Sequence, residues 1–273
     1  MTRLLRIEWL KLKHYKAFWI LSAMYALGVI LVCSGGMFLM EFLKSKGADF
    51  EGLDPTMLPL YDFPDIWQNI TYIASFFKII LAFIIIISIS NEASFRTLRQ
   101  NIIDGLSNKE FLMSKLALIL ALSIFTSVLL FTIGLITGSA YSHVWGLSYI
   151  FQSTQFLLAY ALEVFTYLTF ALMVVLFIRK TGMVIVGLFM YTIMFEPLFI
   201  VFLENYPDTP EFIRSLGPFF PIAALNNLIH VPFQRYIFME IQDYVSLKET
   251  LIVFGWMIFN ITMCYQILKR KDL

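Results

Sequence analysis

Charged side chains are scarce in this chain of 273 residues: they make up 14% of it, whereas 59% of the residues are hydrophobic. A soluble domain usually carries about 25% charged residues, so this chain has too little polar surface to face water on all sides. The net charge of +1 at pH 7 provides no basic surface for a phosphate backbone, which argues against nucleic acid as a partner. The composition predicts an integral membrane protein.

Residues that carry catalysis or bind metals are equally few. The three histidines, His14, His143 and His230, fall far apart and on different sides of the predicted membrane, so no metal site is expected. The phosphate-binding sequence G-x-x-x-x-G-K-S/T does not occur, and no Ser–His–acid grouping is apparent. The two cysteines, Cys33 and Cys264, lie in apolar runs at different predicted depths and are not expected to form a disulfide. We therefore expect neither enzyme activity nor a cofactor in this chain.

Six apolar runs are long enough to cross a hydrocarbon core of about 30 Å, which takes roughly 20 helical residues. They cover residues 17–40, 70–90, 114–140, 153–178, 183–203 and 250–268. The expected fold is a single all-α membrane domain over residues 1–273. Within the segment 204–249, the apolar stretch from Pro218 to Pro232 is too short to span, and it predicts a re-entrant or interfacial segment.

Lysine and arginine give the orientation, because these residues stay mainly on the cytoplasmic side. With the N-terminus on the cytoplasmic side, the inner segments carry fourteen lysines and arginines. The outer segments carry twelve acidic residues and only five cations, Lys44, Lys46, Arg214, Arg235 and Lys248. The sequence therefore predicts that both termini are cytoplasmic.

Residues 1–16 have the pattern of an amphipathic helix at the membrane surface. Apolar and basic residues separate onto two helical faces, with Leu5, Trp9 and Leu12 on one and Arg3, Arg6 and Lys13 on the other. Such a helix places its apolar side in the headgroup layer and its cations toward anionic lipid. A simple basic flank that fixes the topology would carry the same charges, so both interpretations stay open.

Three ionisable residues, Lys78, Glu163 and Glu196, fall inside the predicted spans. A charge in hydrocarbon costs at least about 2.5–3.5 kcal/mol, so we expect Lys78 to pair with Glu163 or Glu196. The pair could only hold spans together, or one carboxylate could line a polar pathway. In the third span, Gly134 and Gly138 form a small-xxx-small pair that allows close helix packing.

The segment 91–115 is more patterned than a connector between spans needs to be. It contains Glu92, Arg96, Thr97, Arg99, Gln100, Asp104, Gly105 and Ser107, with Lys109 and Lys115 beyond. Gly105 favours a turn, and Ser107 followed by Glu110 is a capping-box sequence at a helix start. These signals predict a short cytoplasmic helix, a turn and the third span, with Arg96 and Arg99 available to a partner. The alternative is a solvated loop whose cations set the topology.

The order Glu92-x-x-x-x-Thr97-x-Arg99-Gln100, then Asp104-Gly105-x-Ser107 and Lys115, resembles the loop between helices two and three of type-2 ATP-binding-cassette permeases. These permeases are the membrane subunits of exporter-type complexes. The basic N-terminal helix, the six spans and the proline-broken segment before the last span are similar to that family over the whole chain. One departure is Asn108, in a stretch where the family often has arginine.

The resemblance implies a coupling helix in residues 91–113 that seats on a separate ATPase subunit. The residues that would form or shape this contact are Glu92, Arg96, Thr97, Arg99, Asp104, Gly105 and Ser107, and Arg179 and Lys180 would flank a second one. ATP and Mg²⁺ would bind to the ATPase and not to this chain. One chain of six spans would form half of a translocation pathway, so a second permease copy, identical or related, is implied. The implied location is a bacterial inner membrane.

Two other functions fit part of the sequence. A transporter or channel without an ATPase would use Lys78, Glu163 and Glu196 as an ion-coupling network, but it gives no reason for the patterned loop. A membrane scaffold or immunity component would bind a partner and move nothing, and it would tolerate substitutions along the interface between subunits.

Overall fold

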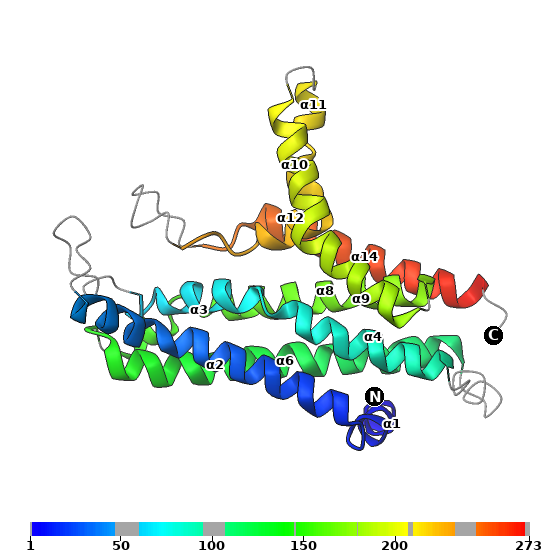
Figure 1. Ribbon diagram of the computed structural model, residues 1–273, viewed down its shortest axis with the longest axis horizontal. Helices are drawn as coiled ribbons and strands as arrows, with labels where there is room; N and C mark the ends of the chain where they lie inside the picture. Colours follow the sequence, from blue (N-terminus) through cyan, green and yellow to red (C-terminus); the bar gives the residue numbers. More distant parts are fainter. Residues whose placement is uncertain are drawn as a thin grey trace.

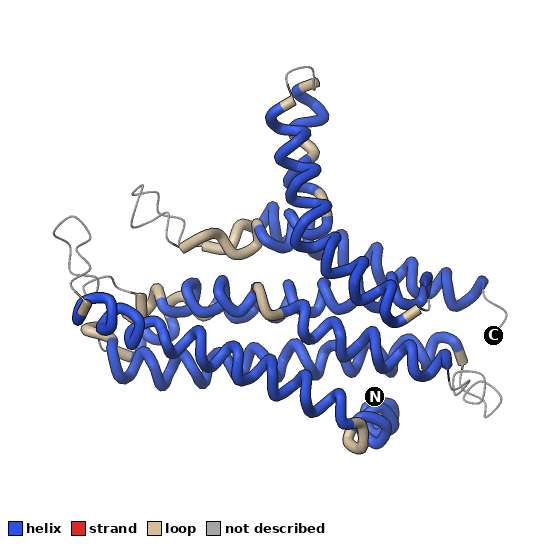
Figure 2. Tube along the Cα trace, viewed as in Figure 1, coloured by secondary structure: helices blue, strands red, loops and turns tan. Residues whose placement is uncertain are grey.

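A computed structural model describes residues 2–46, 60–94, 107–144, 146–178, 180–206, 210–232 and 244–270. All regular structure in these ranges is helical, as predicted, and the longer helices form an elongated bundle (Figure 1, Figure 2). The elements are α1 (Thr2–Leu12), α2 (Lys16–Ser45), α3 (Ile66–Ser75), α4 (Lys78–Ser94), α6 (Asn108–Tyr141), α7 (Leu147–Phe151), α8 (Gln155–Ile178), α9 (Thr181–Met190), the π-helical turn η2 (Tyr191–Phe195), α10 (Glu196–Asn205), α11 (Glu211–Arg214), the 3-10 turn η3 (Gly217–Phe219), α12 (Pro221–Asn226) and α14 (Leu247–Arg270).

Five helical stretches of the described chain are long and apolar enough to cross a membrane. They are Lys16–Gly36, Asn108–Tyr141, Leu147–Ile178, Thr181–Asn205 and Leu247–Arg270. A sixth crossing follows if the bent pair Ile66–Ser75 and Lys78–Glu92 acts as one span. Each of the six runs seen in the sequence thus overlaps a helical stretch.

The second predicted span, residues 70–90, is not one straight helix. It consists of α3 and α4, which meet at a bend of 44°. The Ser75 hydroxyl, just before the break, donates to the Tyr72 carbonyl at 2.8 Å, a side-chain bond that often bends helices. The break also makes Lys78 the first residue of α4, where its side chain reaches the interior of the bundle.

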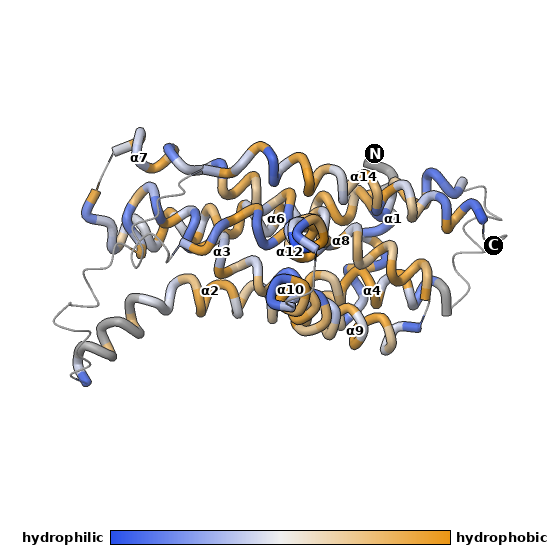
Figure 3. Tube along the Cα trace, turned by 90° about the horizontal axis from the view of Figure 1, so that it is seen from above, coloured by the Kyte–Doolittle hydropathy of each residue, from blue (hydrophilic) through white to orange (hydrophobic). Residues whose placement is uncertain are grey.

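Helix α8 lies at the centre of the bundle and packs against α3, α4, α6, α9 and α14. Its fully buried residues recur at the spacings of three and four that define one helical face, and they include Tyr160, Val164, Tyr167, Leu168, Ala171, Leu172 and Val175. Hydrophobic residues line most of the bundle's length (Figure 3). The core therefore surrounds α8, and the other spans are arranged on it.

The fifth apolar stretch changes direction at η2. Helix α9 follows the bundle, whereas α10 turns away from its long axis (Figure 1) and is seen end-on in the second view (Figure 3). Pro197 lies just beyond η2 and has no N–H to donate to the preceding turn, which explains why regular α-helical bonding is interrupted here. Only 17% of the most apolar stretch in Thr181–Asn205 is buried, against 56% in Leu147–Ile178, so this span lies at the edge.

Gly134 and Gly138 lie where α3 and the residues before it approach α6. A side-chain carbon built at Gly134 would come within 2.6 Å of the Trp67 ring, and one at Gly138 would overlap the Phe63 ring. The absence of a side chain at these two positions lets bulky aromatic rings pack directly on the α6 backbone.

Several helix ends gather at one end of the bundle. Helix α1, the end of α4, the start of α6 and the end of α14 lie there (Figure 1). The Asn108 side-chain amide of α6 donates to the Leu268 carbonyl of α14 at 3.2 Å, which joins two of these ends directly. This end of the bundle contains Ser94 and Ser107, the described residues on either side of residues 95–106.

Candidate functional site

The residues predicted to contact an ATPase fall partly outside the described chain. Those outside it are Arg96, Thr97, Arg99, Asp104, Gly105 and Arg179, and those within it are Glu92, Ser107 and Lys180. The described helices that flank residues 95–106 are α4 and α6. The site is therefore built from these two helices and from α1, which packs on α6.

A buried group of charges joins the three helices, and we call Glu8, Lys11, Glu92, Ser114 and Lys115 the charge cluster. The Lys115 ammonium lies 2.6 Å from Glu8 Oε2 and 2.6 Å from Glu92 Oε1. Lys11 lies 3.1 Å from Glu92 Oε1 and 3.6 Å from Glu8 Oε1. The Ser114 hydroxyl donates to Glu8 Oε1 at 3.2 Å. Two carboxylates thus face two ammonium groups.

Lys115 and Glu8 are each only 1% exposed and Glu92 is 7% exposed, so the charge cluster is largely removed from solvent. Removing one partner from such a group is costly, because it leaves an uncompensated charge in a poorly solvated site. Glu8 belongs to α1, Glu92 to the end of α4 and Lys115 to the first turns of α6. The cluster therefore connects both sides of residues 95–106 to the N-terminal helix.

Electrostatics around Glu8 favour its ionised form. Burial alone would raise the pKa of Glu8, but the nearby Lys115 and Lys11 ammonium groups and the hydrogen bonds from Lys115 and Ser114 outweigh it. The pKa of Glu8 is therefore held below its ordinary value of 4.5. Glu8 therefore carries its negative charge at neutral pH.

The capping box predicted at the start of the third span is present. The Ser107 hydroxyl accepts a hydrogen bond from the Glu110 backbone N–H at 3.2 Å, and Glu110 Oε2 accepts from the Ser107 N–H at 2.9 Å. This reciprocal pair defines where α6 begins and thus where the preceding loop ends. Lys180, in the other predicted contact, occupies the residue before α9 and is exposed.

Among the ionisable residues inside the spans, Lys78 pairs with Glu163. The Lys78 ammonium lies 2.5 Å from Glu163 Oε1, and it also donates to Asn226 Oδ1 at 3.1 Å. Lys78 is 4% exposed and Glu163 1%. The contact joins α4 and α8 to α12, a short helix within the predicted re-entrant segment 204–249.

Glu196 does not pair with Lys78 directly, and it holds the opposite end of α12. Its Oε1 accepts hydrogen bonds from the backbone N–H groups of Ile222 and Ala223 at 2.7 and 2.8 Å. The first N–H groups of a helix have no partner within the helix, and Glu196 supplies one. Lys78 and Glu196 thus fix α12 from its two ends.

Four residues of these sites were not foreseen from the sequence, namely Glu8, Lys11, Ser114 and Asn226. Glu8 could have been noticed, because it lies between Leu5 and Leu12 on the face predicted to be apolar. Ser114 and Lys115 follow Phe111 by one helical turn, and Phe111 is buried too. Asn226 offers no comparable signal, since its role depends on how α12 folds back into the bundle.

Across the described ranges, no group of three or more His, Cys, Asp or Glu side chains could hold a metal ion. Cys33 and Cys264 are both buried, unoxidised thiols. The charged groups of the two sites contact one another, the side chains of Ser114 and Asn226, and backbone N–H groups, so these contacts hold the helices together.

The fold and its sites define a multi-pass, all-helical membrane protein with a charge cluster at one end of the bundle. A family model described as an ABC-2 family transporter protein matches residues 4–203. The match covers more than half of the chain, which therefore belongs to the ABC-2 family of transporter proteins. It includes the charge cluster and the whole of residues 91–113. A comparison with curated proteins finds no match.

Proposed function

We propose that this chain is the permease subunit of an ATP-binding-cassette export complex and is driven by a separate ATPase subunit. The observation that carries the proposal is the family match over residues 4–203, which includes the patterned loop. In this proposal the ATPase binds ATP and Mg²⁺ and seats against residues 91–113. Arg96 and Arg99 supply the positive charge of that contact.

The charge cluster supports a route for coupling. Lys115 of α6 contacts both Glu92 of α4 and Glu8 of α1, so a force applied to the loop between α4 and α6 reaches three helices together. Glu92 faces Lys115 and is 7% exposed, so it would support the loop from the interior of the bundle. ATP-driven movement of the ATPase would then tilt α1, α4 and α6 as one unit.

The proposed complex contains a second permease copy, because one chain forms half of a translocation pathway. The least buried spans supply surface for it: 22% of the apolar stretch is buried in Lys16–Gly36, 17% in Thr181–Asn205 and 22% in Leu247–Arg270. We place the complex in a bacterial inner membrane with both termini cytoplasmic. Helix α1 and the end of α14 lie at the same end of the bundle (Figure 1), which supports placing both termini on one side of the membrane.

An ATPase-independent, ion-coupled transporter is less well supported. It requires Lys78, Glu163 and Glu196 to exchange ions, whereas Lys78 pairs with Glu163 and Asn226, and Glu196 holds the start of α12. These contacts suit a structural role for the three residues.

Affinity purification from native membranes in mild detergent, followed by mass spectrometry, tests the proposal. We expect an ATPase with a phosphate-binding loop to copurify with the wild type and to be lost in the double variant Arg96→Glu and Arg99→Glu. Lys46→Glu and Lys248→Glu, on the predicted outer side, are charge-matched controls that should retain it. A preparation that lacks an ATPase even after crosslinking contradicts the proposal.

A further inference from the structure

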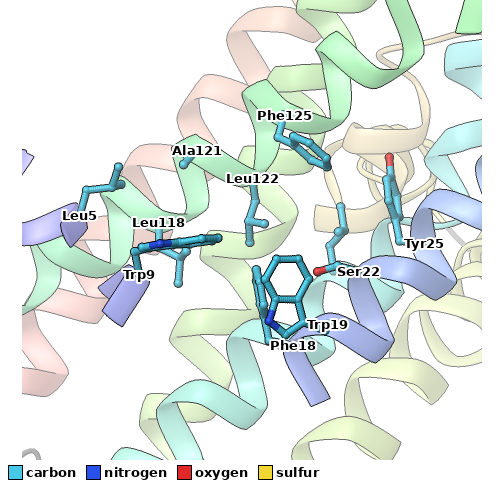
Figure 4. A pocket seen from close by; sticks show the side chains of 11 residues that line it. Leu5, Trp9, Phe18, Trp19, Ser22, Tyr25, Leu118, Ala121, Leu122 and Phe125 are labelled. Atoms are coloured by element: carbon cyan, nitrogen blue, oxygen red, sulfur yellow. The ribbon is translucent and has the colours of Figure 1, made fainter. Parts of the chain in front are cut away.

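A cavity of about 390 Å³ lies between α1, α2 and α6, next to the charge cluster but separate from it. Its walls are almost wholly apolar and include Leu5 and Trp9 of α1, Phe18 and Tyr25 of α2, and Leu122 and Phe125 of α6 (Figure 4). The volume falls within the roughly 300–1,000 Å³ typical of sites for small ligands. The family description assigns no ligand to this cavity. The proposed coupling route does not involve it either.

The polar groups on its walls are largely occupied by partners within the protein. The Tyr25 hydroxyl is hydrogen-bonded to the Tyr160 hydroxyl at 2.5 Å, and the Trp19 indole N–H donates to the Lys13 carbonyl at 2.9 Å. Ser22 contributes a small hydroxyl. A ligand with many polar groups would lose its hydration there without replacement, so the cavity favours a hydrocarbon chain.

The cavity wall is short enough to lie within one leaflet of a membrane. From Phe18 to Tyr25, the first and last lining residues of α2, the helix rises about 10 Å, which is less than half of a hydrocarbon core of about 30 Å. Trp9 and Trp19, half-exposed beside the α1–α2 turn, have the character of residues at the headgroup level. The cavity therefore extends from that level toward the middle of the bilayer.

The accessible charges of α1 and of the α1–α2 turn determine which headgroup suits the cavity. Arg6 in the middle of α1 and Lys16 at the start of α2 are exposed, and Lys13 in the turn is half-buried. The acidic residue of α1, Glu8, is 1% exposed and engaged by Lys115. The accessible charge at the turn is therefore positive, which attracts an anionic lipid.

We propose that this cavity binds one acyl chain of an anionic phospholipid, whose headgroup lies against Arg6, Lys13 and Lys16. The site holds a structural lipid at the junction of α1 with α2 and α6. The proposal does not depend on an ATPase, because it rests on the cavity, its occupied polar groups and the positive charges of α1 and the α1–α2 turn.

The test uses the full chain in vesicles of phosphatidylglycerol and phosphatidylcholine in equal amounts, with one lipid at a time carrying a photoreactive group on its acyl chain. Crosslinked peptides are mapped by mass spectrometry. We expect phosphatidylglycerol to label residues of the cavity wall such as Phe18 and Leu122. Ala121→Trp should remove most of this labelling, because the larger side chain at a wall position occupies volume that the acyl chain would otherwise fill.

Leu120→Trp is the matched control, because it adds the same side chain one residue earlier at a position that is 43% exposed and does not line the cavity. It should leave the labelling unchanged. Replacing Arg6 and Lys13 by Gln should remove a roughly tenfold preference for phosphatidylglycerol over phosphatidylcholine. Thermal unfolding in detergent verifies that each variant is folded.

Several outcomes would overturn the proposal. In the wild type, labelling of the exposed residues Ile124 and Val128 is compared with labelling of the cavity wall. Equal labelling would show only annular lipid. Equal labelling by both lipids would contradict the anionic headgroup. If the cavity crosslinks in native membranes to another protein and not to lipid, its occupant would be a protein partner. The wild-type map alone decides these points even if Ala121→Trp does not fold.

Discussion

Lys115 shows how one side chain can organise the end of a helical bundle. It lies near the start of a span, where a lysine would ordinarily reach toward the membrane surface, and yet it is 1% exposed. Its two contacts at 2.6 Å reach residues on two other helices. Because each acidic partner is itself buried, the lysine cannot be removed without leaving negative charge in a poorly solvated place.

We predict that Lys115→Met destabilises the protein by about 3–5 kcal/mol, because Glu8 and Glu92 lose their main counter-charge. Thermal unfolding of the purified chain in detergent measures the effect. Lys109→Met is the control, since Lys109 lies six residues earlier on α6 and is exposed. Equal unfolding temperatures for Lys115→Met and Lys109→Met would show that the cluster adds no stability.

The pH dependence of stability follows from Glu8, which faces Lys11 of its own helix, Ser114 and Lys115 of α6, and Glu92 of α4. Its folded-state pKa is lowered from 4.5, so its contribution is fully present above that value and is lost as the pH falls through the folded pKa. We predict that the wild type loses stability as the pH drops below 4.5. Glu8→Gln should be less stable at neutral pH and show a smaller loss on acidification, measured as unfolding temperature against pH. An unchanged slope in the variant would contradict the assignment.

At the scale of elements, the approach of α3 to α6 depends on two glycines. We predict that Gly138→Leu and Gly134→Leu each destabilise the bundle by about 1–3 kcal/mol, because the new side chain collides with Phe63 or Trp67. Gly187→Leu on α9 is the matched control, since nothing lies within 4 Å of its added carbon. Denaturation in detergent compares the three variants, and similar losses at all three positions would rule out a specific packing role.

The short helix α12 is held by residues of other helices. We predict that Glu196→Ala leaves the Ile222 and Ala223 N–H groups without a partner, at a cost of about 1–3 kcal/mol, and loosens residues 217–229. Hydrogen exchange of this segment is the measurement. Glu204→Ala is the control, because Glu204 is also an acidic residue of α10 but is exposed. Unchanged exchange in Glu196→Ala would mean that α12 is held by apolar packing alone.

The sequence indicated the helices well and their contacts poorly. Run length and apolarity report on whether a segment can cross a membrane, and all six runs overlap helical stretches. The bend between α3 and α4 does not change hydropathy and was therefore missed. Glu8 and Lys115 are 107 residues apart in the chain, and no local pattern reports on such a contact. The capping box of Ser107 was predictable, because it depends on residues only three positions apart.

At the scale of the whole molecule, three helices share the charge cluster at one end, and α8 is the shared packing surface along the bundle. Helices α4 and α6, which flank residues 95–106 in the sequence, are both joined to α1 by the charge cluster. In the proposed complex, this arrangement would pass force from residues 95–106 to three helices. The stretches Lys16–Gly36, Thr181–Asn205 and Leu247–Arg270 are weakly buried in the single chain, which leaves apolar surface for lipid and for the proposed second copy.

The proposed contact between residues 91–113 and a separate ATPase can be tested by crosslinking. A photoreactive amino acid is placed at Arg99 in native membranes, with the same probe at Lys46 and Lys248 as controls on the predicted outer side. We expect a crosslink from position 99 to a subunit bearing a phosphate-binding loop, and none from positions 46 and 248. Crosslinks from position 99 to lipid alone, or to the ATPase from the control positions instead, would contradict it.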